Sequence, residues 1–190
     1  MATIGLDKLV YAPITEDKNG NETYGTPVQL AKAISAELSI ELNEAILFAD
    51  DGQSEAVKEF KSGTISLGVD DIGNEAAVAL VGATLDSNGV LISGGEDISQ
   101  YVAIGFRAKK SNGKYKYYWL YRVLFGIPAT SLATKGDSIT FSTPTIEGAI
   151  YRRNKPDGNN KHPWKAEITE TQETSETINA WYNSVYEPEY

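Results

Sequence analysis

The chain has 190 residues, of which 41% are hydrophobic and 23% are charged, so it has enough apolar side chains to build one sizeable core. It contains no cysteine and a single histidine, which excludes a disulfide-stapled scaffold, a cysteine nucleophile and a zinc finger. No apolar run approaches the length that a helix needs to cross a bilayer, so no membrane partner is expected.

Charge is sorted into blocks along the chain. Residues 1–99 carry 17 acidic and 5 basic side chains, whereas residues 100–165 carry 3 acidic and 12 basic ones. Residues 166–190 carry 6 acidic side chains and no lysine or arginine. Such blocks favour a surface with oppositely charged faces and therefore head-to-tail association of copies, unless folding interleaves them in space.

The first part of the chain predicts an exposed loop followed by two strands. Residues 15–25 are polar and contain an Asn-Gly pair, which is typical of an exposed loop. Residues 33–42 alternate strictly between apolar and polar side chains, which predicts a half-buried antiparallel strand. Residues 64–69 repeat this alternation, but Phe60 has the opposite parity, so we expect a β-bulge near Ser62 and Gly63.

The middle of the chain predicts a helix and a hairpin. Residues 73–83 fit a short helix that is capped by Asn74 and ends at Gly82. Residues 101–125 fit a β-hairpin with a two-residue Asn-Gly turn, which would place Phe106 opposite Trp119. In that register one side of the hairpin faces the core through Val102, Ile104, Phe106, Trp119, Tyr121 and Val123.

The last part of the chain predicts two more strands, a second loop and a helix. Residues 138–143 alternate and are continued by residues 145–151 after an interrupting proline. Residues 154–163 are polar and basic and predict an exposed loop, and residues 163–171 predict a further strand. Residues 175–185 predict an amphipathic C-terminal helix. We therefore expect one domain over residues 1–190 with an all-β fold, a β-sandwich or half-barrel flanked by one or two short α-helices.

Nothing in the sequence indicates an enzyme, a metal site or a cofactor. The chain has no phosphate-binding loop, no serine nucleophile elbow and no zinc-protease motif. His162 lies in a predicted loop and is interpreted as a solvated imidazole. The start of a calcium loop at Asp17 fails because Glu22 stands where glycine is needed.

The aromatic hairpin raises a ligand-binding alternative. Four tyrosines and a tryptophan between residues 115 and 121 lie among lysines and arginines, as in platforms that stack single-stranded nucleic acid. In the predicted register, however, only Tyr118 shares a face with basic side chains. A core role for these rings is therefore favoured over a base-stacking surface.

Several segments, taken in order, resemble the major tail tube proteins of long-tailed, non-contractile bacteriophages of the type common in Gram-positive hosts. The resemblance rests on Ile4–Ala12, Ala33–Leu38, Gly63–Asp71, Tyr101–Phe125 with its Trp119-Leu120-Tyr121 centre, and Ser138–Arg152. It implies a phage tail-tube-like fold and a structural virion protein whose six copies close into a ring. The rings would stack into a tail tube that conducts DNA during its ejection into the host.

The resemblance also implies partners and a location. The partners would be further copies of the chain and other tail proteins such as the tape measure and the tail terminator. Viral DNA would pass through without specific binding. The protein would be located in the tail of the virion, and in the host cytoplasm during assembly.

The small, acidic face of the predicted strands suits the lumen of such a tube, because hydroxyls and carboxylates do not hold phosphate. The lumen-facing candidates are Ser35, Glu37, Ser39, Glu41, Thr64 and Ser66. Lys58 and Lys61 would weaken this negative wall if either faced inward. The candidates for inter-subunit contacts in the two loops are Asp17, Lys18, Asn19, Lys155, Asp157 and Lys161.

Two functions of other classes stay open at this point. One is a single-stranded nucleic-acid-binding β-barrel, and the other is a capsid decoration or adhesion β-sandwich. Stoichiometry discriminates between them, because a tube requires six-fold rings whereas decoration proteins would be monomers or trimers.

Overall fold

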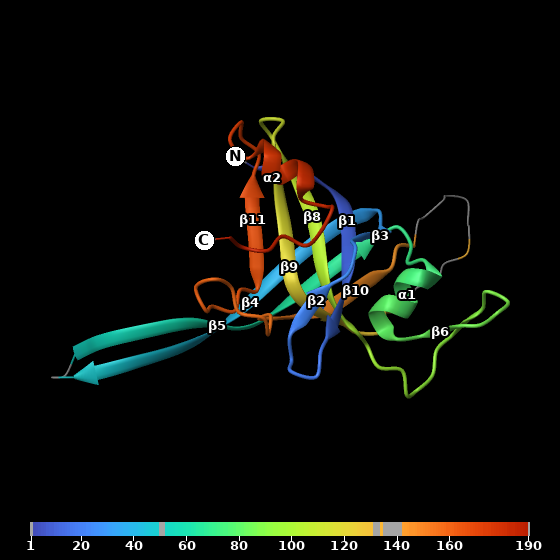
Figure 1. The fold of residues 1–190 in the computed structure, drawn as a ribbon, viewed down its shortest axis with the longest axis horizontal. Coiled ribbons are helices and arrows are strands. Elements are labelled where there is room, and N and C mark those ends of the chain that lie inside the picture. The colour runs from blue at the N-terminus through green and yellow to red at the C-terminus, as the bar shows by residue number, and fades with distance from the viewer. Residues whose placement is uncertain (1, 50–51, 131–133, 135–141, 190) are drawn as a thin grey trace.

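The chain folds mainly into β-strands in a computed structural model that describes residues 2–49, 52–130, 134 and 142–189 (Figure 1). Two short helices, α1 (Asn74–Val81) and α2 (Ser175–Ala180), flank the strands. The expected all-β class with short flanking helices is therefore confirmed. The strands are β1 (Thr3–Glu16), β2 (Glu22–Tyr24), β3 (Val28–Ala31), β4 (Ala33–Ala49), β5 (Gly52–Val69), β6 (Thr84–Leu85), β7 (Leu91–Ile92), β8 (Tyr101–Lys110), β9 (Tyr115–Phe125), β10 (Thr145–Tyr151) and β11 (Lys165–Thr169).

Within the described residues, nine strands form one sheet with the order β2-β1-β8-β9-β10-β5-β4. The strand β3 pairs with β1, and β11 pairs with the part of β9 that β10 leaves free. The strands β6 and β7 form a separate two-stranded sheet. Strand β4 contacts β1 across the interior although the two are not hydrogen-bonded, so the sheet is curled into a half-barrel.

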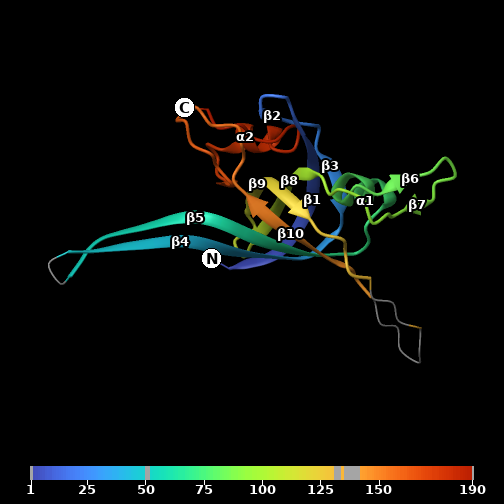
Figure 2. The same ribbon diagram turned by 90° about the horizontal axis from the view of Figure 1, so that it is seen from below.

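Apolar side chains cover both faces of the central hairpin β8–β9. Inside the curl, Ile104, Phe106, Leu120 and Val123 pack with Ile65 and other residues of β5 and with α1. On the outer face, Tyr117, Trp119 and Tyr121 pack under Trp181 and Val185 of the C-terminal segment. Figure 2 shows α2 on one side of β8 and β9 and the β4–β5 hairpin on the other. The central hairpin is therefore a middle layer with two dry faces.

The predicted register of this hairpin is wrong over its turn-side half. Phe106 pairs with Tyr118 and Gly105 pairs with Trp119, one residue away from the expected alignment. A bulge between Val102 and Ile104 restores the expected pair Val102–Val123 further along. All six side chains expected at the core of the hairpin are buried, but Trp119 and Tyr121 lie on the opposite face from Phe106 and Ile104.

The turn explains the shift of register. The backbone N–H of Lys110 donates to the carbonyl of Lys114 at 2.8 Å and closes a three-residue loop, while the carbonyl of Lys110 accepts from the N–H of Gly113 at 3.0 Å. Gly113 takes a positive φ of 83° at the last position of the loop. This is a three-residue turn with a left-handed glycine, in place of the two-residue turn expected from Asn112-Gly113. Because both faces of the hairpin are buried, the hydrophobic pattern could not distinguish the two registers.

The two helices differ from their predicted bounds. Helix α1 ends as expected at Gly82, which has a φ of 75°, but its N-cap is Gly73 and no side chain caps it. Helix α2 stops at Ala180, whereas residues up to 185 were expected to be helical. Trp181 and Val185 are nevertheless buried, because a turn after α2 carries them onto the outer face of β9.

Two other predictions concern the strands. The expected bulge near Ser62 is confirmed, because the β4–β5 pairing shifts between Glu41 and Leu42 and leaves Lys61 as the extra residue. A strand was expected at residues 138–143, of which residues 138–141 lie outside the described residues. The expected continuation at residues 145–151 is strand β10.

Candidate assembly surfaces

The polar side chains of β4 and β5 share one face of the sheet. In the antiparallel pairing, Glu37 lies opposite Ser66 and Ser39 lies opposite Thr64, while Glu41 lies opposite Ser62. Directly paired residues point to the same side of a sheet. The structure therefore brings the six lumen-facing candidates together on one face, which we call the polar face, and it leaves Glu37, Glu41 and Thr64 exposed.

Strand β10 extends the polar face with residues that sequence analysis missed. Glu147 pairs with Ser66 and Thr145 pairs with Gly68, so both belong to this face. Ser66 thus lies between two glutamates, Glu37 on β4 and Glu147 on β10, in one row across three strands. With strands spaced roughly 5 Å apart, the two carboxylate-bearing positions are roughly 10 Å apart. No local pattern marks Glu147, because its membership depends on the long-range pairing of β10 with β5.

The lysines next to the polar face are paired with glutamates. The Nζ of Lys61 lies 3.3 Å from Oε2 of Glu41, and Ser62 donates to the same oxygen. Lys58 pairs with Glu44 at 3.1 Å, and this pair occupies the other face of the hairpin. One of the two lysines therefore does lie beside the polar face, where it offsets part of the charge of Glu41.

The opposite face of β4 is apolar and is not covered within one chain. The strand was expected to be half-buried, but Ile34 and Leu42 are 55% and 56% exposed and Leu38, Ile40 and Ile46 are also exposed. The expectation is wrong for the single chain because the outer part of the β4–β5 hairpin extends beyond the body of the protein (Figure 1). Among the side chains of β4 that the structure describes, Ala33 and Ala36 are the ones that pack against the core inside the curl.

Strand β4 is also a free edge. Within the part of the chain that the structure describes, it pairs with β5 alone and stands at the end of the sheet order. A groove of about 650 Å³ runs beside it. Its lining includes the charged side chains of Glu37, Lys165 and Glu167 and the apolar or aromatic side chains of Ile34, Leu38, Leu6, Phe106 and Tyr118. A long edge strand with unpaired backbone groups and exposed apolar side chains is a template for pairing with another chain.

The aromatic hairpin does not form a stacking platform. Trp119 and Tyr121 are fully buried and Tyr117 is 6% exposed, so their faces are not available to nucleobases. Tyr118 was expected on a face with basic side chains, and the Nζ of Lys116 does lie 5.3 Å from the centre of its ring. The ring also stacks on Phe106 inside the curl, with ring centroids 4.9 Å apart. These rings serve packing, because each touches one of the two apolar clusters.

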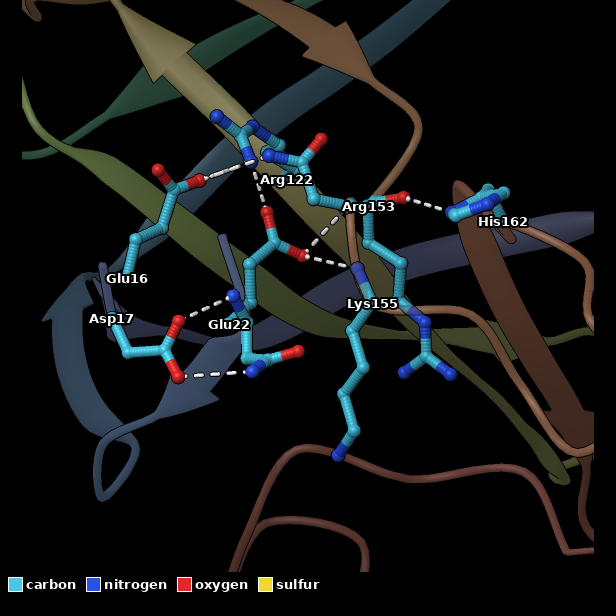
Figure 3. A network of polar contacts seen from close by, with 9 residues as sticks. Glu16, Asp17, Glu22, Arg122, Arg153, Lys155 and His162 are labelled. Atoms are coloured by element: carbon cyan, nitrogen blue, oxygen red, sulfur yellow. Dashed lines mark hydrogen bonds and ion pairs between the residues drawn. The ribbon is translucent and has the colours of Figure 1, made fainter. Parts of the chain in front are cut away.

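The two predicted loops lie side by side and are tied to each other (Figure 3). Glu22 was expected in an exposed loop, but residues 14–16 and 22–24 pair as strands and its side chain is fully buried. Glu22 accepts hydrogen bonds from Arg122 and from the backbone N–H of Asn154 at 2.8 Å. The carboxylate can be buried because Arg122 and the backbone of Asn154, which are 100 and 132 residues away in sequence, replace the hydrogen bonds that water would make.

The inter-subunit loop candidates divide into two groups. Asp17 and Asp157 accept hydrogen bonds from the backbone of their own turns, at 2.8 Å from Asn21 and Lys161 respectively. The pKa of Asp17 is lowered, chiefly by its hydrogen bond from the Asn21 side chain. Lys155 is held by Glu187 at 3.1 Å. The remaining candidates are exposed: Lys18, Asn19 and Lys161.

An open pocket of about 690 Å³ lies where the two loops meet one end of β9, and we call it the basic pocket. Four lysine or arginine side chains and a histidine line it, with no carboxylate among the lining residues, which are Asn19, Gly20, Lys61, Tyr101, Arg122, Tyr151, Arg152, Arg153, Asn154 and His162. Arg122 lies 3.8 Å from the centre of the Tyr101 ring, and Tyr101 meets Tyr151 edge to face. The pocket therefore combines positive charge with an aromatic wall.

The buried arginines of the pocket keep their charge. Burial lowers the pKa of Arg122, but hydrogen bonds to Tyr101, Glu16 and Glu22 outweigh it and raise that pKa overall. Burial also lowers the pKa of Arg153, but the carboxylate of Glu187, which lies 2.8 Å from its guanidinium, outweighs this effect and raises the pKa overall. His162 is exposed, and its Nδ1 lies 3.0 Å from the carbonyl oxygen of Arg153. Because a carbonyl oxygen can only accept, Nδ1 is the donor of this hydrogen bond.

The described residues contain no group of three side chains suited to holding a metal ion. Among the same residues, neither helix has the length and the apolar character that crossing a membrane requires.

Comparison with known proteins gives a likeness of fold and nothing closer. No protein-family model and no curated protein matches the chain. One solved structure with a similar fold is the cryo-EM structure of the anti-feeding prophage cap, described as a tube terminating cap. The two share 11% sequence identity and a TM-score of 0.46 over 90% of this chain and 93% of that one. At these values the likeness says nothing about what this chain does.

Proposed function

We propose that the chain is a structural protein of a bacteriophage tail that assembles as stacked hexameric rings into the tail tube, the conduit for DNA ejection. The observation that carries this proposal is the β4–β5 hairpin. Within one chain it has a free edge at β4, exposed apolar side chains along β4 and an opposite face of short hydroxyls and carboxylates.

Each of these features has a use in a ring. A free edge gains backbone hydrogen bonds when the neighbouring copy pairs with it. The apolar side chains Leu38, Ile40 and Leu42 leave water when that copy packs against them, which stabilises the ring by about 25 cal/mol per Å² of apolar surface. Repeated six times, the hairpins would form a closed wall without edges.

The polar face is then the side that meets the DNA. Glu37 and Glu147 repel phosphate, and the hydroxyls of Ser39, Thr64 and Ser66 are too short and uncharged to grip it. Lys61, which lies beside these residues, is engaged by Glu41. A wall of this chemistry lets a polyanion slide, whereas phosphate contacts with lysine or arginine would hold it.

Electron microscopy of the concentrated, purified chain tests the proposal. We expect six-fold rings, or tubes of stacked rings, in negative stain and a matching large species in sedimentation velocity. A chain that stays monomeric at every concentration, or that forms only trimers, contradicts the proposal and favours a decoration or adhesion role.

The polar face has a test of its own. We expect tubes of the wild type to leave double-stranded DNA unbound, and tubes of the variant Glu37→Lys/Glu147→Lys to retain it in a salt-dependent manner. Co-sedimentation of DNA with tubes measures the effect. The matched control is Glu176→Lys, an exposed position on α2. Equal DNA binding by all three proteins would remove Glu37 and Glu147 from the lumen.

A further inference from the structure

The basic pocket has positive charge that the chain itself does not balance. Arg122 is paired with Glu16 and Glu22, Arg153 with Glu187 and Lys61 with Glu41. Arg152 is exposed, and it forms no ion pair with any of the described residues. The pocket therefore suits a partner that brings one or two carboxylates and an apolar side chain for the aromatic wall, whereas a polyanion would need many free cations.

A second surface of the same chain has the opposite character. Residues 70–100, which we call the acidic lobe, comprise α1 and the β6–β7 sheet and carry six acidic side chains but no lysine or arginine. Four of the six, Asp70, Asp71, Asp86 and Asp97, accept hydrogen bonds from backbone N–H groups, and Asp70 also pairs with Lys32. Glu75 and Glu96 are exposed, and no residue in the described part of the chain pairs with them.

The acidic lobe also exposes apolar side chains. Ile98 is 74% exposed, two residues from Glu96, and Leu85, Val90 and Ile92 on and beside the β6–β7 strands are exposed too. The β6–β7 sheet is hydrogen-bonded to no other described strand and reaches the core through Leu91, and so small a sheet gains stability when another surface covers its exposed side. The lobe thus offers carboxylates and apolar groups together.

The positions of the two surfaces fit a head-to-tail contact. The acidic lobe projects at the end of the molecule remote from the β4–β5 hairpin (Figure 1). The basic pocket includes Lys61, which lies at the bulge where that hairpin leaves β10. A contact between two different surfaces of identical chains is heterologous, and such contacts close into rings when the rotation between copies allows it.

We propose that the acidic lobe of one copy docks into the basic pocket of the next, with Glu75 and Glu96 facing Arg152 and Ile98 lying against the wall of Tyr101 and Tyr151. This inference deepens the proposed function and rests on it, because it names the second contact between neighbouring subunits. The charge blocks of the sequence interleave within one chain, because Arg107 pairs with Asp7 and Arg122 pairs with Glu16 and Glu22. The docking therefore uses only the charges that are left over, those of Glu75, Glu96 and Arg152.

Charge reversal tests the contact. We expect the lobe variant Glu75→Lys/Glu96→Lys and the pocket variant Arg152→Glu each to lower the amount of assembled protein about tenfold at a fixed concentration, which corresponds to about 1.4 kcal/mol. Combining the three substitutions in one chain should restore assembly, because the reversed charges are again complementary. Matched controls are Glu176→Lys and Lys114→Glu, both exposed and outside the two surfaces, and neither should change assembly.

Site-specific cross-linking gives a readout that does not depend on rings. Because the chain has no cysteine, Ser87→Cys at the tip of the lobe and Asn19→Cys in the pocket introduce single thiols. A mixture of the two variants with a short bismaleimide should yield the mixed dimer, whereas Ser87→Cys mixed with Glu176→Cys should not.

The outcomes separate the two proposals. Rings of the wild type without the mixed dimer, or a combined charge variant as impaired as its parents, overturn the docking and leave the tail tube standing. A mixed dimer from a chain that never forms rings supports the docking and contradicts the tube. The absence of both rings and mixed dimer overturns both.

Discussion

Single side chains decide how the two loops and the basic pocket are held. Glu22 is the clearest example, because its buried carboxylate satisfies the Arg122 guanidinium and two backbone N–H groups, those of Asn154 and Lys155. Removing one partner of a buried ion pair leaves the other uncompensated in a poorly solvated place.

Replacement of Glu22 should therefore destabilise the chain strongly. We expect Glu22→Ala to lower the free energy of unfolding by about 3 kcal/mol. The control Glu16→Ala removes a carboxylate that is 38% exposed and contacts the same Arg122, and it should cost no more than about 1 kcal/mol. Urea unfolding of both variants measures the difference, and equal costs would show that Glu22 is no more important than its exposed neighbour.

Stability should fall in acid through Glu167. The hydrogen bond from Lys116 at 2.6 Å, followed by that from Lys165 at 2.8 Å, lowers the pKa of Glu167 below its ordinary value of 4.5, while burial opposes the shift. Because the folded pKa is the lower one, the unfolded chain binds more protons in acid. The contribution of Glu167 is complete above pH 4.5 and is lost as the pH falls through the folded pKa.

Glu167→Gln removes this contribution. We expect the difference in unfolding free energy between wild type and variant to be largest near neutral pH and to narrow below about pH 4. Urea unfolding at a series of pH values measures it, with Glu176→Gln as an exposed carboxylate that forms none of the described ion pairs. A difference that stays constant from neutral pH to acid would contradict the assignment.

At the scale of elements, the strands with clear alternation were predictable, whereas β1, β2, β3, β6 and β7 were missed and the alignment of the β8–β9 hairpin was wrong. The alternation in β4 and the bulge at Lys61 follow from local patterns, because one residue out of phase must be absorbed somewhere. The β8–β9 register depends on packing from two sides at once, so Trp119 could face Phe106 in the pattern while facing Gly105 in the fold. Likewise, Glu147 belongs to the polar face because β10 pairs with β5, and Glu22 can be buried because Arg122 pairs with it. Neither long-range pairing is visible in a local sequence pattern.

A methyl group at Gly105 distinguishes the two registers. A Cβ there would lie 2.8 Å from the Trp119 ring, which fills the space opposite the glycine. We expect Gly105→Ala to lower the free energy of unfolding by about 1–3 kcal/mol through overpacking. Gly5→Ala on β1 is the control, because its Cβ would make an ordinary contact at 3.6 Å. Thermal unfolding measures both, and a harmless Gly105→Ala would favour the register in which Trp119 faces Phe106.

At the scale of the whole molecule, the chain divides into a well-packed body, which includes Ile65, Leu67 and Val69 of β5, and the outer part of the β4–β5 hairpin, which packs against little. The body has apolar clusters on both sides of β8 and β9, whereas most described side chains of β4 are exposed. Exposed apolar residues that touch little within the chain contribute little to its stability and much to association.

Leu42→Asp should separate these two properties. We expect it to leave the unfolding midpoint of the monomer within the range of ordinary surface substitutions, because Leu42 is 56% exposed, while reducing assembly about tenfold. Ile127→Asp is the control, since Ile127 is 82% exposed and lies outside the hairpin. Sedimentation velocity measures assembly, and an equal loss in both variants would show that general surface hydrophobicity is responsible.

The outer cluster over β9 has a consequence for synthesis on the ribosome. Its lid, Trp181 and Val185, is translated some 60 residues after the tyrosines and tryptophan that it covers. Because synthesis proceeds at roughly 5–20 residues per second, these apolar side chains of β9 stay uncovered for several seconds after β9 has been made. Chaperones can bind during this interval. A synonymous codon change that slows translation between residues 126 and 180 would therefore prolong their access and leave the amino-acid sequence unchanged.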